Sequence, residues 1–174
     1  MKNNGKVVLS LIIAFVLSAY LQDRLPSFTV YAIKIPFIIA AFVYFAFRHN
    51  WIIGIIATAL SAVFGDGLSL SCGIAYLIVC SLTTILIYFF LKKQLVENSI
   101  SCGLIALPLT LVLLLIQYFC IVVYEGVSLP FYFLLTKLLL TAVITAIVTV
   151  VLSELFYRFE IIVGNKEVVN EELG

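Results

Sequence analysis

Few side chains in this sequence are of a type that could carry chemistry, and they interrupt long apolar stretches. Asp66 stands between two glycines, Gln117 lies in an uncharged segment, and Lys137 and Glu154 lie in the last one. His49 is the only histidine, and no H-E-x-x-H, P-loop or G-x-G-x-x-G pattern is present. We therefore expect no catalytic residues. Without clustered sulfur and nitrogen ligands, we expect no metal and no cofactor either.

Asp66 is the sharpest single candidate, because Gly65 and Gly67 flank it and allow backbone conformations with positive φ. One interpretation is a tight turn into the next apolar segment, with the Asp66 carboxylate capping the following helix. The other is a contact with a ligand or a partner protein, since ionisable groups within a membrane are functional candidates. The turn is favoured, and the contact stays open.

Small residues recur at intervals of four in the apolar stretch around Asp66. The two lines are Gly54, Thr58 and Ala62, and Ala57, Ser61 and Gly65. This spacing lets membrane helices approach one another closely. Packing inside the chain is the favoured interpretation, and docking of another protein's membrane helix is the alternative.

A polar line with the same spacing runs along the last apolar segment. Its members are Lys137, Thr141, Thr145, Thr149 and Ser153. They can line a polar cavity between helices, or the hydroxyls can bond the carbonyls one turn earlier. Lys137 either extends to the outer membrane boundary or pairs with Glu125 or Asp66.

The four cysteines carry little information. Cys72, Cys80, Cys102 and Cys120 form no C-x-x-C pair, and each lies in an apolar segment. We expect them to be small buried apolar side chains.

Composition determines the kind of element that must hold these residues. The 174 residues are 64% hydrophobic and 11% charged, whereas soluble domains are about 45–50% apolar and about 25% charged. A soluble domain of this size could not bury so much apolar surface, so a bilayer is the expected solvent. The net charge of +1 gives no field for a polyanion, and we expect no nucleic-acid partner.

Charged residues divide the chain into six apolar segments. They are Val7–Gln22, Phe28–Phe47, Trp51–Phe64, Leu68–Leu91, Asn98–Tyr124 and Leu129–Tyr157. A membrane helix needs about 20 residues, so the 14-residue third segment either crosses or re-enters. The predicted fold class is all-α: a polytopic integral membrane protein with six transmembrane helices. Residues 1–157 are expected to form one transmembrane domain and residues 158–174 a short cytoplasmic tail. The first segment is expected to be retained, because no small-residue cleavage site precedes Asp23.

The distribution of lysine and arginine predicts the orientation. With six spans and a cytoplasmic N-terminus, seven cations lie inside, namely Lys2, Lys6, Arg48, Lys92, Lys93, Arg158 and Lys166. Two lie outside, Arg24 and Lys34. Without the third span the best division is six against three. The positive-inside rule favours the sharper asymmetry, with both termini cytoplasmic.

The first half of the chain resembles the MreD rod-shape-determining family. Leu17–Pro26, LSAYLQDRLP, is similar to the end of that family's first helix, and the early Pro36 to its second span. Trp51–Leu77, WIIGIIATALSAVFGDGLSLSCGIAYL, resembles its glycine-containing helix, acidic residue, short loop and following apolar helix. The positions that match are Gly54, Asp66 and Gly73.

This resemblance implies a non-catalytic component of the bacterial cell-elongation complex in the cytoplasmic (inner) membrane. Such a protein helps to position peptidoglycan synthesis and maintain cell shape. The implied partners are an MreC-like protein, a RodA-type glycosyltransferase, a class B penicillin-binding protein and, indirectly, the actin-like MreB. The residues expected to pack helices or contact partners are Gly54, Thr58, Ala62, Gly65, Asp66, Gly67 and Gly73.

The alternative belongs to a different functional class. Substrate-binding S-components of energy-coupling-factor vitamin transporters are also small six-helix proteins, and their third helix is similar. Such a protein would bind a small molecule near the outer face. Few polar groups are available there, which favours the shape protein.

Overall fold

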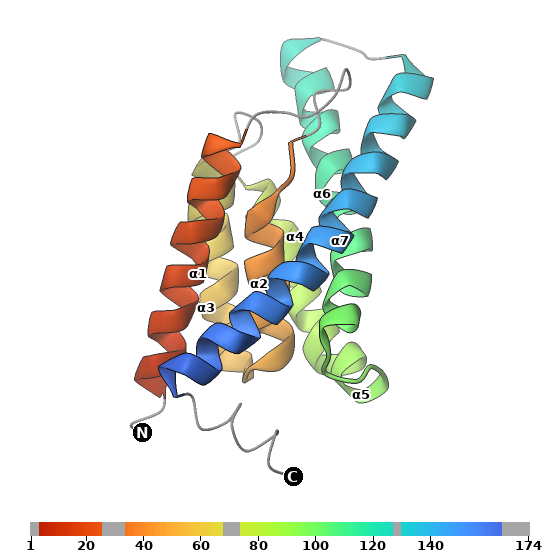
Figure 1. Cartoon of the computed structure of the whole chain (residues 1–174). Helices are drawn as coiled ribbons and strands as arrows, with labels where there is room; N and C mark the ends of the chain where they lie inside the picture. The colour runs from red at the N-terminus through yellow and green to blue at the C-terminus, as the bar shows by residue number, and fades with distance from the viewer. Residues whose placement is uncertain (1–3, 26–33, 68–73, 127–129, 165–174) are drawn as a thin grey trace.

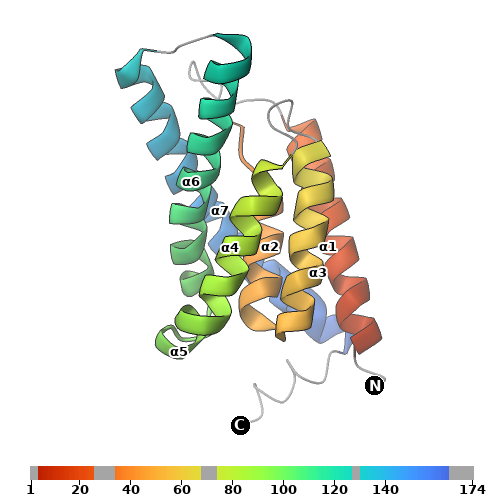
Figure 2. The ribbon, with the colours of Figure 1, turned by 180° about the vertical axis from the view of Figure 1, so that it is seen from behind.

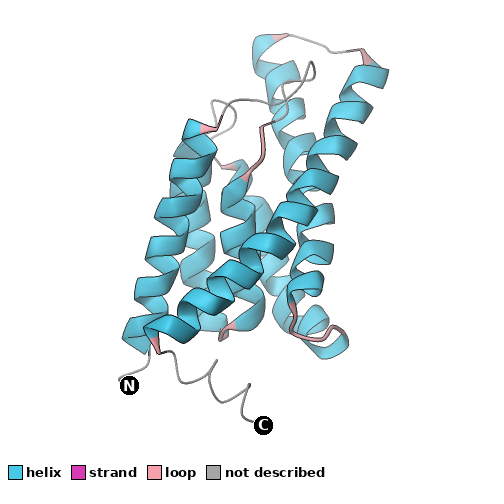
Figure 3. Cartoon of the chain, in the orientation of Figure 1, coloured by secondary structure: helices cyan, strands magenta, loops and turns pink. Residues whose placement is uncertain are grey.

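Helices make up all the regular structure in the described part of the chain (Figure 3). The computed structural model describes residues 4–25, 34–67, 74–126 and 130–164, without the side chains of residues 4, 124 and 125. The elements are α1 (Asn4–Arg24), α2 (Phe37–Arg48), α3 (Trp51–Ser61), η1 (Ala62–Asp66), α4 (Ala75–Leu86), η2 (Ile87–Leu91), α5 (Lys92–Gln94), α6 (Ser99–Glu125) and α7 (Phe131–Val163). The π-helical turn η1 continues α3, and η2 and α5 continue α4, so the elements form the six predicted helices.

The lengths of these helices fit a membrane protein. Four stretches are long and apolar enough to cross a bilayer: Gly5–Arg24, Ala75–Gln94, Ser99–Val123 and Phe131–Val163. Phe37–Arg48 and Trp51–Asp66 are apolar but shorter. Large hydrophobic side chains face outward from the bundle, as on α1, where Leu9, Val16 and Tyr20 are exposed. Such a surface suits lipid rather than water.

Helix α2 is the centre of the bundle. It packs against α1, α3, α6 and α7, and Figures 1 and 2 show it between them from both sides. Every side chain from Phe37 to Phe47 is buried. A helix that is apolar all round must be covered all round, which explains its central place.

The second predicted span, 28–47, is wrong at its start, because the helix begins only at Phe37. Pro36 lacks an N–H and biases the residue before it towards extended backbone, so Lys34 and Ile35 are not helical. The amide oxygen of Gln22 accepts a hydrogen bond from the Ile38 N–H at 3.3 Å. Thus α1 satisfies one of the free N–H groups at the start of α2.

Two other predicted boundaries differ from the structure. The fourth helix begins at Ala75 rather than Leu68, and residues 68–73 lie outside the described part. The last helix continues to Val163, six residues beyond the predicted end at Tyr157. Gly164 ends it with φ of +73°, a conformation that glycine adopts without strain. Residues 158–163, expected in a tail, therefore belong to the bundle.

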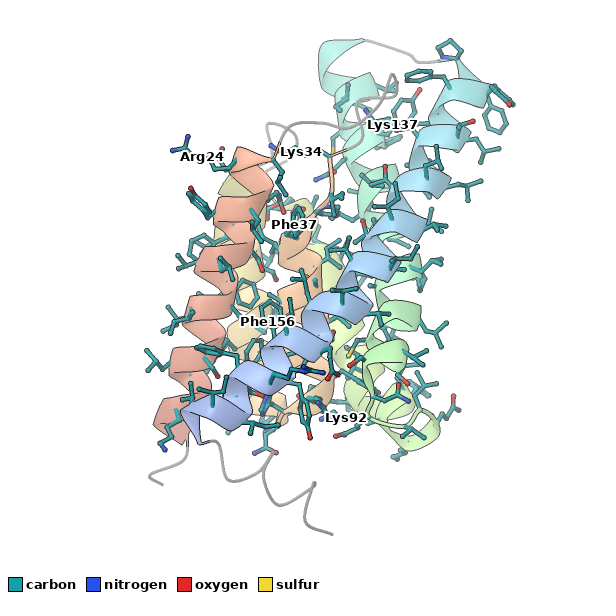
Figure 4. All side chains as sticks on the ribbon, viewed as in Figure 1. Arg24, Lys34, Phe37, Lys92, Lys137 and Phe156 are labelled. Atoms are coloured by element: carbon teal, nitrogen blue, oxygen red, sulfur yellow. The ribbon has the colours of Figure 1, made fainter. Side chains whose placement is uncertain are left out.

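The cations of the described residues separate to the two ends of the bundle. Arg24, Lys34 and Lys137 lie at one end and Lys92 at the other (Figure 4). The Lys6 ammonium donates to the Gly164 carbonyl at 3.3 Å, so α1 begins where α7 ends. We call the end with Lys6, Arg48, Lys92, Lys93 and Arg158 the basic end. The positive-inside rule predicts a cytoplasmic location for this end.

The cysteine prediction is correct in part. Cys80 and Cys102 are free and buried. Cys120 is disulfide-bonded, contrary to expectation. It lies near the last turn of α6, at the end opposite the basic end. Cys72 lies outside the described residues.

Candidate functional site

Asp66 holds the start of α4. Its two carboxylate oxygens accept hydrogen bonds from the backbone N–H groups of Tyr76 at 3.0 Å and Leu77 at 3.4 Å. These groups belong to the first turn of α4, where N–H groups lack partners within the helix. The capping interpretation of Asp66 therefore matches the geometry.

The glycines beside Asp66 have different roles from the one predicted. Gly67 has a φ of −66°, in the ordinary helical region, and a side chain there would meet open space. At Gly65, an added Cβ would lie 2.5 Å from the Tyr76 ring. Gly65 is therefore needed for a close approach between η1 and α4, and positive φ is not used at Gly67. Gly73 lies outside the described residues.

The small residues of α3 pack inside the chain. At Gly54, an added Cβ would lie 2.8 Å from Cε2 of the Tyr88 ring. One turn later, the hydroxyls of Thr58 and Thr84 are 2.8 Å apart. Ala62 is half-buried on the same side. This seam joins α3 to α4 and η2, as the favoured interpretation of the small-residue spacing required.

The seam also positions the end of α2. Because Gly54 leaves room for its ring, Tyr88 reaches the His49 carbonyl and donates a hydrogen bond at 2.7 Å. The Lys92 ammonium donates to the same carbonyl at 2.6 Å. The His49 carbonyl at the end of α2 therefore accepts from two donors on the continuous helix formed by α4, η2 and α5. These bonds satisfy one of the carbonyls that the end of a helix leaves without a partner.

The polar line of α7 forms bonds within its own helix. Thr141, Thr145 and Thr149 are buried, and each hydroxyl donates at 2.7 Å to the carbonyl four residues earlier. Lys137 is half-buried and its carbonyl accepts the first of these bonds. The local hydrogen bonds along α7 therefore account for the three threonines, as the second of the two interpretations expects.

A buried carboxylate that sequence reasoning missed lies at the basic end. Glu160 is 1% exposed. One carboxylate oxygen accepts from the Tyr44 hydroxyl at 2.6 Å and is 3.1 Å from Nε2 of His49. The other accepts from the Ser10 hydroxyl at 3.1 Å. These residues join α7 to α2 and α1, and we call them the Glu160 cluster.

The Glu160 cluster is fixed by packing as well as by hydrogen bonds. The His49 ring stacks on Phe45 with centroids 5.5 Å apart, and Phe156 packs against both Tyr44 and Phe45. Two carboxylate oxygens facing three possible donors suit an ionised acid, which is only an acceptor. The arrangement can anchor the end of α7 across α2, which it crosses obliquely in Figure 1.

A sequence signal for Glu160 existed. The residue lies seven positions after Ser153, so it continues the buried polar line of α7 by two turns. The charged residues around it pointed instead to a tail. His49 carries no such signal, because its partner lies 111 residues away in the chain.

The loop between α5 and α6 is held at the same end. Arg48 donates to the Glu97 carbonyl at 3.4 Å, and its guanidinium lies 4.2 Å from the centroid of the Tyr157 ring.

Glu154, singled out from the sequence, accepts from Arg158 at 3.1 Å on the exposed side. Within the described residues, no group of three His, Cys, Asp or Glu side chains could hold a metal ion.

Comparison with known proteins adds no identification. No protein-family model, curated protein or solved structure matches the chain.

Proposed function

We propose that this protein is a non-catalytic component of the bacterial cell-elongation complex in the cytoplasmic membrane. In this role it helps to position peptidoglycan synthesis and maintain cell shape. Its partners would be an MreC-like protein, a RodA-type glycosyltransferase and a class B penicillin-binding protein, with MreB acting indirectly. The proposal starts from the resemblance of residues 17–26 and 51–77 to the MreD family.

One structural observation supports the proposal most: three sets of polar side chains bind helices to one another. Asp66 caps α4, Thr58 bonds Thr84, and Glu160 joins α7 to α1 and α2. Groups engaged in this way hold a bundle in one shape. A rigid bundle with an apolar outer surface is suited to presenting membrane helices to other membrane proteins.

The alternative, a vitamin-binding S-component, requires polar groups at the outer face that are available to a ligand. Both oxygens of Asp66, its leading candidate, accept hydrogen bonds from α4. The hydroxyls of Thr141, Thr145 and Thr149 donate to carbonyls of α7. This use of the polar groups favours the scaffold over the transporter component.

The partner surface differs from the one that the small residues suggested. Gly54, Thr58 and Gly65 face α4 and η2, so they are not open to a partner helix. Contacts with partner proteins would instead use the exposed side chains on the outer surface of the helices.

Photocrosslinking in living cells tests this proposal. A photoreactive amino acid is placed at one exposed position on each helix other than the buried α2. The positions on α1, α3, α4, α6 and α7 are Ile13, Ile55, Leu82, Leu104 and Ile147. We expect crosslinks to an MreC-like protein or a wall synthase only from positions on helices that lie next to each other, because a single partner surface covers adjacent helices. Crosslinks to transporter subunits, or none to wall-synthesis proteins from any rod, would contradict the proposal.

A further inference from the structure

A groove opens on the outer side of α3 and α4. It has a volume of about 280 Å³ and is lined by Trp51, Ile55, Thr58, Ser81, Thr84, Ile85, Tyr88 and Phe89. Its rim is formed by large side chains, with Trp51 62% and Phe89 67% exposed. Its floor is formed by the paired hydroxyls of Thr58 and Thr84.

A cation lies at one end of this groove. The Lys92 ammonium is 4.7 Å from the centroid of the Tyr88 ring, which lines the groove. Its bond to the His49 carbonyl fixes it beside the turn that leads into Trp51. Lys93 follows and is exposed. The groove thus ends at Lys92 at the basic end, and the exposed Lys93 is the next residue in the chain.

The size of the groove decides what kind of molecule fits. The groove, at about 280 Å³, can take a single hydrocarbon chain, and the hydroxyls on its floor leave the lining mostly apolar. The lysine at its end adds an attraction for an anionic headgroup.

We propose that the α3–α4 groove binds one anionic phospholipid of the cytoplasmic leaflet. An acyl chain lies in the groove, and the phosphate lies at Lys93 and the exposed part of Lys92. The Glu97 carboxylate, 3.8 Å from the Lys92 ammonium, is the acidic group nearest to this lysine among the described ion pairs. Lys93 therefore supplies most of the attraction. Basic residues beside membrane helices on the cytoplasmic side bind anionic headgroups in this manner. The site is independent of the proposed function.

Native mass spectrometry of the protein in nanodiscs tests this site. The nanodiscs contain equal amounts of phosphatidylglycerol and phosphatidylcholine, and the retained lipids are counted after release. The wild type is expected to retain one phosphatidylglycerol in preference to phosphatidylcholine. Lys93→Gln should lower that preference about fivefold, the factor expected for one lysine at an anionic surface. Ser81→Phe, which fills the groove, should release the lipid.

Matched controls separate the site from general effects. Arg24→Gln removes a cation from the opposite end, and Leu82→Phe enlarges a side chain on another face of α4; both should leave the preference unchanged. Equal retention of the two lipids by the wild type would overturn the proposal. An unchanged lipid preference in Lys93→Gln would also overturn it, because this surface substitution leaves folding intact. A partner helix crosslinked from Ile55 in place of the lipid would overturn it as well.

Discussion

The carboxylate of Glu160 lies 3.1 Å from Nε2 of His49, although 111 residues separate the two in the chain. Both side chains are almost fully buried, at 0% and 3% exposed. The contact fastens the last turns of α7 to the end of α2, and the Ser10 hydroxyl extends it to α1. The Glu160 cluster therefore closes the bundle at its basic end.

Replacing Glu160 with alanine should destabilise the bundle strongly. The change leaves the Tyr44 hydroxyl and the His49 ring buried without their acceptor, while the Ser10 hydroxyl keeps its bond to the Val7 carbonyl at 2.9 Å. The expected cost is about 3–5 kcal/mol. Reversible unfolding in detergent, followed by tryptophan fluorescence of Trp51, measures it. The control is Glu154→Ala, because Glu154 is 48% exposed in its pair with Arg158. Exposed pairs are worth about 0–1 kcal/mol, so equal losses in the two variants would contradict the role of the cluster.

Enlarging Gly54 should disturb the end of α2. In Gly54→Leu the side chain meets the Tyr88 ring, which must move away from the His49 carbonyl. Overpacking of this kind costs about 1–3 kcal/mol. Gly67→Leu is the matched control, since a side chain at Gly67 meets open space. The difference in melting temperature between the two variants is the measurement, and no difference would refute the close approach.

Asp66 should act as a helix cap and not as an essential charge. Asp66→Ala is expected to lose about 0.5–2 kcal/mol, the usual value of an N-terminal cap, while Asp66→Asn keeps an acceptor oxygen and loses less. Unfolding of both variants measures the effect. If Asp66→Asn abolishes partner recovery but leaves stability intact, the carboxylate has a role beyond the cap.

The Cys120 disulfide predicts which end of the bundle faces outward. Disulfides persist in oxidising compartments, so the end of the bundle with Cys120 should face away from the cytoplasm. Because a bonded sulfur does not react, Cys120 should resist alkylation in denaturant until a reductant is added. Cys80 and Cys102, which are free, should react at once under the same conditions. Peptide mapping by mass spectrometry reads all four cysteines and identifies the partner sulfur. Immediate alkylation of Cys120 would contradict the bond.

Periodicity and charge could predict the helices but not their ends. The apolar segment 98–124 matches α6 within one residue at each end, and Asn98 caps it by accepting from the Ser101 N–H at 2.8 Å. The start of α2 at Phe37 follows from Pro36, and the Gln22 amide oxygen of α1 then accepts from the Ile38 N–H. The end of α7 at Val163 follows from Gly164, while donors from α1 and α2 hold its last turns. A proline and a glycine mark these two ends, and hydropathy alone does not.

The separation in the chain between a residue and its partners decides which parts of the site could be predicted. Asp66 and Gly54 could be found from the sequence because their partners lie on the next helical rod, close in the chain. Glu160 looked like a charged tail residue, since its burial depends on Tyr44 and His49, more than 100 residues earlier. Only three-dimensional packing brings that set together.

Affinity purification in mild detergent tests the proposed function most directly, with mass spectrometry of both proteins and small molecules. The proposal predicts recovery of an MreC-like protein or wall synthases and no stoichiometric metabolite. It also predicts lower recovery with Gly54→Leu, because the bundle that presents the partner surface is deformed. A retained vitamin-like ligand together with transporter ATPases would contradict the scaffold function and favour the S-component.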